Sequence, residues 1–179
     1  MVNGGGIRTN IECGEVLFND LYNAMPLGDM VLTCTLTGQQ LLDILEFSVS
    51  SLSAENGVFM QVSGLRFDVD PSTPSPVVRN AETNYFSHIA NAQRRVSNLQ
   101  IFDKESGTFK NIELSHRYTM ASLDYLILEA GGSGIMQGVE PDNTYRGADI
   151  EVLRYYLEVN LNGNIGNGYK LPQGRINIR

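Results

Sequence analysis

The chain has 179 residues, of which 42% are hydrophobic and 18% are charged. This composition is typical of one globular domain with a sizeable core, and it is too apolar for intrinsic disorder. The formal net charge of −7 argues against a nucleic-acid polymer as partner, because binding many phosphates requires a basic surface. It is compatible with a single nucleotide held by one or two arginines. No run of about 18 apolar residues is present, so the sequence predicts no membrane span.

The first third of the chain predicts a strand followed directly by a helix. Asn19 is a candidate N-cap for a short helix upstream of this unit. Apolar and polar residues alternate over 30–36, which predicts a strand. Thr37 and Gln40 then have the spacing of a capping box, and the apolar stripe after them predicts a helix that runs to about Leu52.

The middle of the chain predicts mainly strands. Segments 59–62 and 65–69 are short apolar runs separated by a glycine, and both predict strands. Segments 95–102 and 108–114 flank a polar five-residue loop, which is a hairpin pattern. The polar stretch 79–93 matches no pattern that predicts an element.

The last third predicts a strand, a helix and a closing strand. The largely apolar segment 118–128 predicts a buried strand that leads into a second glycine-rich loop. Asp149 is a candidate cap for a helix with Ile150, Leu153, Tyr156 and Leu157 on its buried side. Residues 175–178 predict a final strand.

Helices and strands therefore interleave, and at least one hairpin is present. The expected fold class is α/β (α+β), a mixed β-sheet flanked by helices in a single domain that spans 1–179. Cys13 and Cys34 are too few for a disulfide framework, and we predict that both are buried thiols.

The N-terminal segment Asn3-Gly4-Gly5-Gly6-Ile7-Arg8 is the most distinctive stretch of the sequence. Three consecutive glycines let the backbone adopt φ > 0 and let another group approach closely. One interpretation is a nest of backbone N–H groups that binds an anion beside an arginine. The other is a tight turn with nothing bound.

Five further motifs follow this segment in a characteristic order. They are Pro26-Leu27-Gly28-Asp29, Thr37-Gly38-Gln39-Gln40-Leu41-Leu42, Gln61-Val62-Ser63-Gly64-Leu65-Arg66, Tyr118-Thr119-Met120-Ala121-Ser122-Leu123-Asp124-Tyr125-Leu126 and Gly131-Gly132-Ser133-Gly134. Together the motifs resemble the C-terminal, substrate-binding domain of the 5′-nucleotidase family, which includes UDP-sugar hydrolases and 2′,3′-cyclic-nucleotide phosphodiesterases. The resemblance covers nearly the whole chain.

The resemblance implies a nucleoside pocket with one wall formed by the glycine turn around Gly5. Asn3 and Gly57 are expected to contact or line the base, and Arg8 to contact the charged or ribose end of the substrate. Leu27 and Tyr125 stand where the family has the aromatic pair that sandwiches the base.

Three of the implied positions depart from the family pattern. Leu27 replaces a phenylalanine and removes one stacking face, which is worth roughly 1–3 kcal/mol per base. Asp29 stands where the family often has an asparagine that contacts the base, and a carboxylate only accepts hydrogen bonds. Ser133 replaces the aspartate that holds the ribose hydroxyls. These changes argue against adenine nucleotides as the natural ligand, and Tyr125 could instead be a core tyrosine.

The resemblance also implies what lies outside this chain. In the family, an N-terminal metallophosphoesterase domain binds two divalent metal ions and performs the hydrolysis. The sequence has only His88 and His116, neither in a metal-ligand pattern, so no catalytic residue, metal site or cofactor is predicted here. The segment before the glycine turn is short, which favours a longer protein with an N-terminal part and a catalytic domain in the same or a separate chain.

Two functions follow from these observations. The first is a nucleoside- or nucleotide-binding specificity domain of a metal-dependent phosphohydrolase of nucleotide catabolism. The alternative is a non-catalytic interaction module that keeps the fold and has lost nucleotide binding. By resemblance, the expected location is extracytoplasmic: periplasmic, secreted or at the cell surface.

Overall fold

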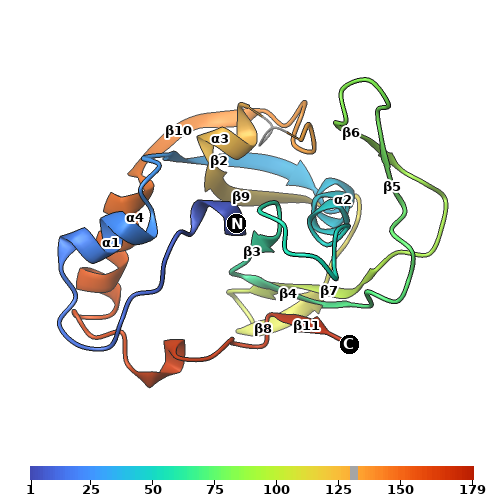
Figure 1. Ribbon diagram of the computed structural model, residues 1–179. Helices are drawn as coiled ribbons and strands as arrows, with labels where there is room; N and C mark the ends of the chain where they lie inside the picture. The colour runs from blue at the N-terminus through green and yellow to red at the C-terminus, as the bar shows by residue number, and fades with distance from the viewer. Residues whose placement is uncertain (130–132) are drawn as a thin grey trace.

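Two sheets on either side of helix α2 form the centre of the fold in the computed structural model, which describes residues 1–129 and 133–179 (Figure 1). The first sheet is antiparallel, with the order β10-β2-β9. The second has the order β11-β4-β7-β8, and only β11 runs parallel to its neighbour. Two small antiparallel pairs, β1-β3 and β5-β6, complete the described strands.

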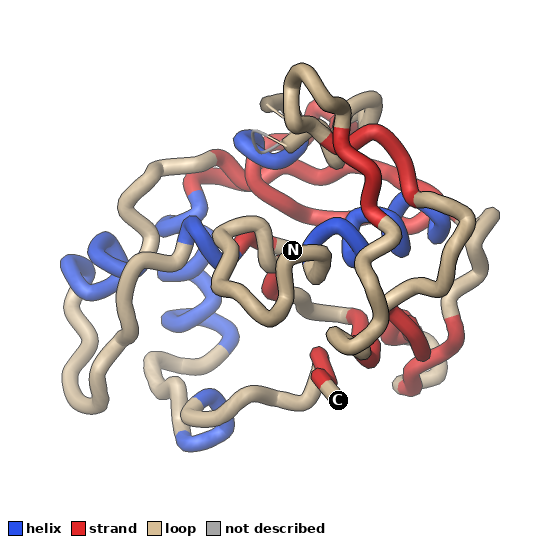
Figure 2. Tube along the Cα trace, turned by 45° about the vertical axis from the view of Figure 1, so that its right-hand side comes forward, coloured by secondary structure: helices blue, strands red, loops and turns tan. Residues whose placement is uncertain are grey.

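The elements interleave along the chain as an α/β fold requires, although the strands form several sheets where the sequence predicted one mixed sheet (Figure 2). The described strands are β1 (Val2–Asn3), β2 (Met30–Thr37), β3 (Met60–Gln61), β4 (Leu65–Val69), β5 (Val77–Arg79), β6 (Phe86–Ile89), β7 (Val96–Asp103), β8 (Thr108–Asn111), β9 (Arg117–Leu123), β10 (Pro141–Ala148) and β11 (Ile176–Ile178). The α-helices are α1 (Phe18–Ala24), α2 (Gly38–Ser48), α3 (Asp124–Ile127) and α4 (Asp149–Tyr155). Short helical turns lie at Gly4–Gly6, Tyr156–Asn160 and Asn167–Tyr169.

The strand–helix unit β2–α2 confirms the capping-box prediction. The Thr37 side chain accepts a hydrogen bond from the Gln40 N–H at 3.2 Å, and the Gln40 side chain accepts one from the Thr37 N–H at 2.8 Å. The helix ends at Ser48, before the predicted end at Leu52. The Arg95 guanidinium binds the carbonyls of the residues beyond the helix, so these carbonyls are satisfied outside a helical ladder.

The core lies between α2 and the two sheets. β2 and β7 both contact α2, and Phe47 of α2 is completely buried. The other large apolar side chains that are fully buried are Leu32, Leu36, Ile44, Leu45, Met60, Leu123, Met136, Val49 and Val69. Cys34 belongs to this core, whereas Cys13 is exposed, so the prediction of a buried thiol is wrong at Cys13.

The prediction of one buried strand over 118–128 is wrong in its second half. Strand β9 ends at Leu123, and helix α3 begins at Asp124. The Asp124 carboxylate accepts a hydrogen bond from the Tyr125 N–H at 2.8 Å and so satisfies a donor at the start of the helix. Tyr125 therefore lies on a short helix and not on a strand.

The caps of α1 and α4 also differ from the predictions. Helix α1 begins at Phe18 with Leu17 as N-cap, because the Asp20 carboxylate accepts the Leu17 N–H at 2.8 Å; Asn19 lies inside the helix. Asp149 is the first residue of α4 and Ala148 is the N-cap. Tyr156, predicted to be buried, is 42% exposed because it lies beyond the helix end, in a π-helical turn.

Both hairpins of the middle region are antiparallel. The β7–β8 hairpin is confirmed, and Asp103 pairs with Thr108. The β5–β6 hairpin begins at Val77, and its turn and second strand fall in the stretch 79–93, where the sequence predicted no element. The Asn80 side chain accepts two backbone N–H groups in its turn, and Asn84 adopts a φ of 59°. Asparagine at both positions is a turn signal that hydrophobic periodicity does not detect. No helix among the described residues is long and apolar enough to cross a membrane.

Candidate functional site

The triple-glycine segment forms a turn against the loop that precedes β3. The Gly4 N–H donates to the Phe59 carbonyl at 2.7 Å, and the Gly5 N–H donates to the Gly57 carbonyl at 2.9 Å. Since these two N–H groups are bound within the chain, they do not form an anion nest. None of the three glycines adopts a positive φ, so the predicted use of glycine for φ > 0 is wrong here.

Close backbone approach explains glycine at position 5. A Cβ atom on Gly5 would lie 3.1 Å from the Gly57 Cα and 3.2 Å from the Gly57 carbonyl oxygen. The Asn3 side chain closes the same contact, because its Nδ2 donates to the Gly57 carbonyl at 3.2 Å. The structure therefore brings Asn3, Gly5 and Gly57 together, as a common binding wall requires.

The Asn3 amide keeps an unused acceptor. Its Oδ1 atom is buried and has no hydrogen-bond partner among the residues that the structure describes, and a Cβ on Gly6 would lie 3.6 Å from it. Buried polar atoms are rarely left unpaired. Asn3 is thus a structural clamp between the glycine turn and Gly57, and its Oδ1 is enclosed by the fold.

Arg8 leaves this turn toward helix α1. Its backbone N–H donates to the Ala24 carbonyl at 2.9 Å, so the arginine lies beside the end of α1. Among residues 1–129 and 133–179, none forms a hydrogen bond or ion pair with the Arg8 guanidinium, and the residue is exposed. The guanidinium is therefore available to an anionic or hydroxyl-bearing ligand.

A second group of predicted residues meets where β2 and α3 begin. One oxygen of the Asp124 carboxylate accepts from the Met30 N–H at 3.0 Å and from the Tyr125 N–H at 2.8 Å. This shared acceptor holds Asp29, which precedes Met30, close to the helix that carries Tyr125. The ring of Tyr125 is half-buried and packs against the core.

The Asp29 carboxyl lies in a strongly negative environment. Burial and repulsion from Asp124, Asp149 and Glu129 raise the pKa of Asp29 above its ordinary value. Its backbone carbonyl accepts the Asp149 N–H at 2.8 Å. No residue in the described part of the chain donates a hydrogen bond to the Asp29 carboxylate.

Leu27 occupies the turn between α1 and β2. Its side chain is 52% exposed, and Gly28 beside it has a φ of 73°, a conformation that favours glycine. An exposed leucine is consistent with the predicted apolar contact surface, and it excludes the simpler interpretation of Leu27 as a core residue.

Ser133 lies in the second glycine-rich loop, where Gly131 and Gly132 fall outside the described residues. Ser133 is buried, and its carbonyl accepts the Phe86 N–H at 2.7 Å. Tyr85 packs on Gly134, since a Cβ there would lie 3.2 Å from the tyrosine ring. The β5–β6 hairpin thus supports this loop, a role that the sequence did not predict.

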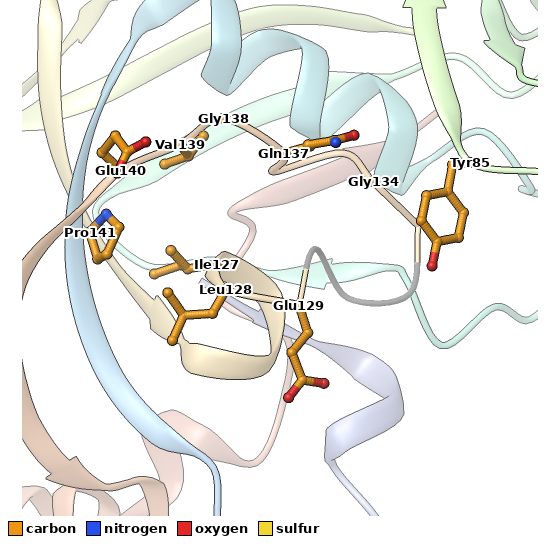
Figure 3. A pocket seen from close by; sticks show the side chains of 10 residues that line it. All are labelled: Tyr85, Ile127, Leu128, Glu129, Gly134, Gln137, Gly138, Val139, Glu140 and Pro141. Carbon is orange, nitrogen blue, oxygen red and sulfur yellow. The ribbon is translucent and has the colours of Figure 1, made fainter. Parts of the chain in front are cut away.

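A pocket of about 330 Å³ lies beside the loop (Figure 3). It is lined by Tyr85, Ile127, Leu128, Glu129, Gly134, Gln137, Gly138, Val139, Glu140 and Pro141. None of these residues was predicted as a site residue. Glu129 lines this pocket and is also one of the charges that act on Asp29, whereas the corner formed by Asp29 and Tyr125 is not part of the pocket lining.

The described residues contain no group of three or more His, Cys, Asp or Glu side chains that could hold a metal ion. Both histidines are exposed, and His116 lies edge-on to Tyr118 with a centroid distance of 4.8 Å. The clamp and the corner instead offer what a small organic ligand needs: hydrogen-bonding groups beside an aromatic ring.

Comparison with known proteins decides the family. The sequence model of the 5′-nucleotidase C-terminal domain matches residues 1–140. The chain belongs to this family. The match contains every predicted site residue, from Asn3 to Ser133.

The named relatives include a nucleotide phosphoesterase and 5′-nucleotidases. The chain is 36% identical over 67 residues to the trifunctional nucleotide phosphoesterase protein YfkN of Bacillus subtilis, a match that covers 37% of this chain and 5% of the relative. It is 26% identical over 162 residues to a 5′-nucleotidase of Vibrio cholerae, covering 89% of this chain and 24% of the relative. The domain thus spans a quarter or less of the length of these relatives.

Solved structures share the fold. A 5′-nucleotidase precursor from Thermus thermophilus superposes with a TM-score of 0.79 at 24% identity, covering 99% of this chain and 30% of that one. The NAD nucleotidase of Haemophilus influenzae superposes with a TM-score of 0.71 at 20% identity, covering 99% and 29%. The fold class predicted from the sequence, that of a 5′-nucleotidase C-terminal domain, is confirmed.

Proposed function

We propose that this domain binds the nucleoside part of a nucleotide and provides substrate specificity to a metal-dependent 5′-nucleotidase-type phosphohydrolase of nucleotide catabolism. The observation that carries the proposal is the corner in which the Asp124 carboxylate accepts the N–H groups of Met30, next to Asp29, and of Tyr125 at 3.0 and 2.8 Å. An aromatic residue near a carboxylate that accepts no hydrogen bond from the described residues suits a nucleobase, which offers a stacking face and a polar edge.

The glycine turn supplies the second part of the proposed site. Asn3, Gly5 and Gly57 form one clamp, and Arg8 leaves that clamp with a guanidinium that no described residue binds. In the proposal, Arg8 binds the ribose or phosphate end of the ligand, because a guanidinium pairs bidentately with phosphate oxygens. Leu27 adds an apolar contact to the base, and Ser133 a contact to the ribose.

Hydrolysis is assigned to a separate domain. Two divalent metal ions in an N-terminal metallophosphoesterase domain, in the same or another chain, would activate the attacking water and polarise the phosphate. This domain would select the nucleotide and present it to that centre. We place the protein outside the cytoplasm, as the resemblance to the family implies.

Thermal melting of the 179-residue chain tests the proposal. The panel consists of nucleosides, nucleoside monophosphates and UDP-sugars. A ligand at a hundredfold excess over its Kd adds about 2.7 kcal/mol of stability, which corresponds to a Tm increase of about 5–10 °C for a domain of this size. A panel without any shift would overturn nucleotide binding.

Two variants sharpen this experiment. Arg8→Ala should lower the affinity for nucleoside monophosphates at least about tenfold, the loss expected for a charge-assisted hydrogen bond. It should lower the affinity for free nucleosides less. Arg117→Ala is the matched control, because Arg117 is also exposed and also has no ion pair among the described residues. Equal effects of the two variants would remove Arg8 from the site.

The alternative function is a non-catalytic interaction module. One observation favours it. Ser133 is buried, whereas a residue that binds the ribose is expected to be accessible. The same melting panel distinguishes the two functions, because an interaction module that has lost nucleotide binding responds to no nucleoside.

A further inference from the structure

We propose that the free edge of strand β11 binds an extended acidic peptide of another protein, which adds to the sheet as a further strand and places apolar side chains in the groove beside it. This site shares no residue with the proposed nucleoside site. Three properties support it: the unpaired backbone groups of β11, the apolar groove along them, and the positive charge of the segment that carries them.

The first property is the unpaired backbone of β11. This strand lies at the end of its sheet and runs parallel to β4, its one neighbour in that sheet (Figure 1). On the β4 side, the Arg179 N–H donates to the Val69 carbonyl at 3.0 Å. Because alternate residues of a strand direct their backbone groups to opposite sides, those of Ile176 and Ile178 point away from β4. No residue in the described part of the chain hydrogen-bonds to them, and such an edge is a template for a further strand.

The second property is an apolar groove along the same edge, the β11 groove, with a volume of about 420 Å³. Leu171 is 72% exposed and Ile178 is 51% exposed, so the groove is open to solvent. In strand addition, main-chain hydrogen bonds provide affinity and alternate side chains of the peptide enter pockets beside the edge. The apolar lining of the β11 groove includes Phe59, Val62, Tyr169, Leu171, Ile176 and Ile178.

Hydrogen bonds fix the walls of the β11 groove. The Arg175 guanidinium donates to the Val62 carbonyl at 3.1 Å and so joins the β11 side of the groove to the β3 side. The hydroxyl groups of Tyr169 and Tyr156 lie 2.7 Å apart and hydrogen-bond to each other. The groove is therefore formed before a peptide binds, which lowers the entropic cost of binding.

The third property is charge. Residues 159–179 contain Lys170, Arg175 and Arg179 but no Asp or Glu, although the whole chain has a formal net charge of −7. Asp68 forms an ion pair with Arg179. No carboxylate among residues 1–129 and 133–179 forms an ion pair with Lys170 or Arg175. Their positive charge favours a peptide that carries carboxylates beside its apolar residues.

The same charge disfavours a second copy of this chain as the occupant. Pairing of two β11 strands would bring Lys170 and Arg175 of each copy close to those of the other. Like charges that meet across an interface oppose association. An acidic peptide meets no such repulsion and therefore fits the edge better.

Fluorescence anisotropy of the 179-residue chain with a labelled synthetic peptide tests the inference. The probe alternates valine and threonine over six positions and carries three aspartates at one end. A control peptide is N-methylated at each valine and threonine, so it keeps the side chains and the charge but cannot donate backbone hydrogen bonds. We expect saturable binding of the probe below about 1 mM and at least about tenfold weaker binding of the control peptide.

Ile178→Pro removes one N–H group of the free edge and no hydrogen bond to β4. Because proline cannot donate to an added strand, the affinity for the probe should fall about tenfold. Ile178→Ala is the matched control, since it shortens the side chain and keeps the N–H group, and it should lower the affinity less. Melting of each peptide-free variant checks that the fold is retained.

Lys170→Glu tests the contribution of charge. At low ionic strength it should lower the affinity for the probe about threefold to tenfold, and added salt should reduce this difference. Lys104→Glu is the matched control, because Lys104 lies in the β7–β8 turn, is exposed and has no ion pair among the described residues. Equal effects of the two variants would contradict the assignment of the acidic end to this groove.

The remaining outcomes are equally decisive. No binding of the probe at about 1 mM, or equal binding of the N-methylated peptide, would overturn strand addition at β11. Sedimentation of the peptide-free chain as a dimer that Ile178→Pro dissociates would assign the edge to a second copy and overturn the peptide proposal. Failure of the nucleotide panel would leave this inference unaffected, since the two sites share no residue.

Discussion

At the scale of single residues, two side chains of the candidate site have polar atoms without a hydrogen-bond partner among the described residues. Asn3 has a buried Oδ1 without a partner, and Asp29 has a carboxylate without a donor among the described residues. Unsatisfied buried or half-buried polar atoms cost free energy in the ligand-free protein. A ligand that donates to the partly exposed Asp29 carboxylate would recover this free energy, whereas the Asn3 Oδ1 is enclosed by the fold.

The pH dependence of stability tests the environment of Asp29 directly. Its raised pKa means that the folded state favours the protonated carboxyl; this stabilisation is complete below the ordinary pKa of 3.8 and is lost as the pH rises through the higher folded pKa. Because asparagine does not titrate, Asp29→Asn should melt about 1–2 °C above wild type at pH 7. The difference should vanish near pH 3, as measured by calorimetry from pH 3 to 8.

Asp70→Asn is the control with the opposite sign. Hydrogen bonds from Ser72 and Thr73 lower the pKa of Asp70, so its ionised form stabilises the folded state above pH 3.8. This variant should melt below wild type at pH 7. A difference for Asp29→Asn that stays constant with pH would contradict the proposed charge environment.

At the scale of elements, two buried charged residues, Glu46 and Arg95, join α2 to the start of β7 through hydrogen bonds with backbone groups. Glu46 is fully buried and accepts the backbone N–H groups of Arg95 and Val96 at 2.9 and 3.0 Å. In the other direction, the Arg95 guanidinium donates to carbonyls beyond the end of α2 and to the Thr73 carbonyl in the loop between β4 and β5. These contacts fix where α2 ends, which helix propensity alone leaves open.

Replacing Arg95 should therefore be costly. Arg95→Met leaves the carbonyls of Val49, Leu52 and Thr73 without the guanidinium, and we expect a loss of about 3–5 kcal/mol in the free energy of unfolding, the range for breaking a buried charged network. Urea denaturation measures it. The neighbouring Arg94→Met is the control: its ion pair with Asp43, at 2.7 Å, is partly exposed, so the loss should be at most about 1 kcal/mol. Similar losses would contradict the role of Arg95.

At the scale of the whole molecule, one helix holds the two main sheets and a distant hairpin together. Phe47 of α2 is completely buried between the sheets. Its ring lies edge-on to Phe86 of the β5–β6 hairpin with a centroid distance of 5.9 Å, and the Arg79 guanidinium lies 4.6 Å from its centre. The same hairpin supports the Ser133 loop, so Phe47 and this loop are connected through contacts with Phe86.

Phe47→Ala should lower the free energy of unfolding by about 3–5 kcal/mol, because it leaves a large cavity in the core. Amide exchange should also show lost protection in the β5–β6 hairpin, more than in the β7–β8 hairpin. Phe47→Leu keeps most of the volume and should cost about 1.5 kcal/mol or less. Equal loss of protection in both hairpins would indicate general destabilisation and would contradict the specific link through Phe47.

Sequence alone determined the elements whose signals are local. The alternation over 30–36 and the Thr37–Gln40 spacing predicted β2 and the start of α2, because strand periodicity and capping depend on neighbouring residues. The ordered motifs from Asn3 to Ser133 predicted the family and fold, and the comparison with known proteins confirmed both.

Only the tertiary structure decided features that depend on contacts between distant segments. Gly5 is required by close approach to Gly57 and not by a positive φ; Tyr125 lies on a helix because Asp124 binds its N–H together with that of Met30. Periodicity could not show either, since the partners are separated by 52 and 94 residues along the chain. Likewise, the Asp29 carboxylate accepts no hydrogen bond from the described residues because the nearby N–H groups of Met30, Tyr125 and Ile150 bind other carboxylates.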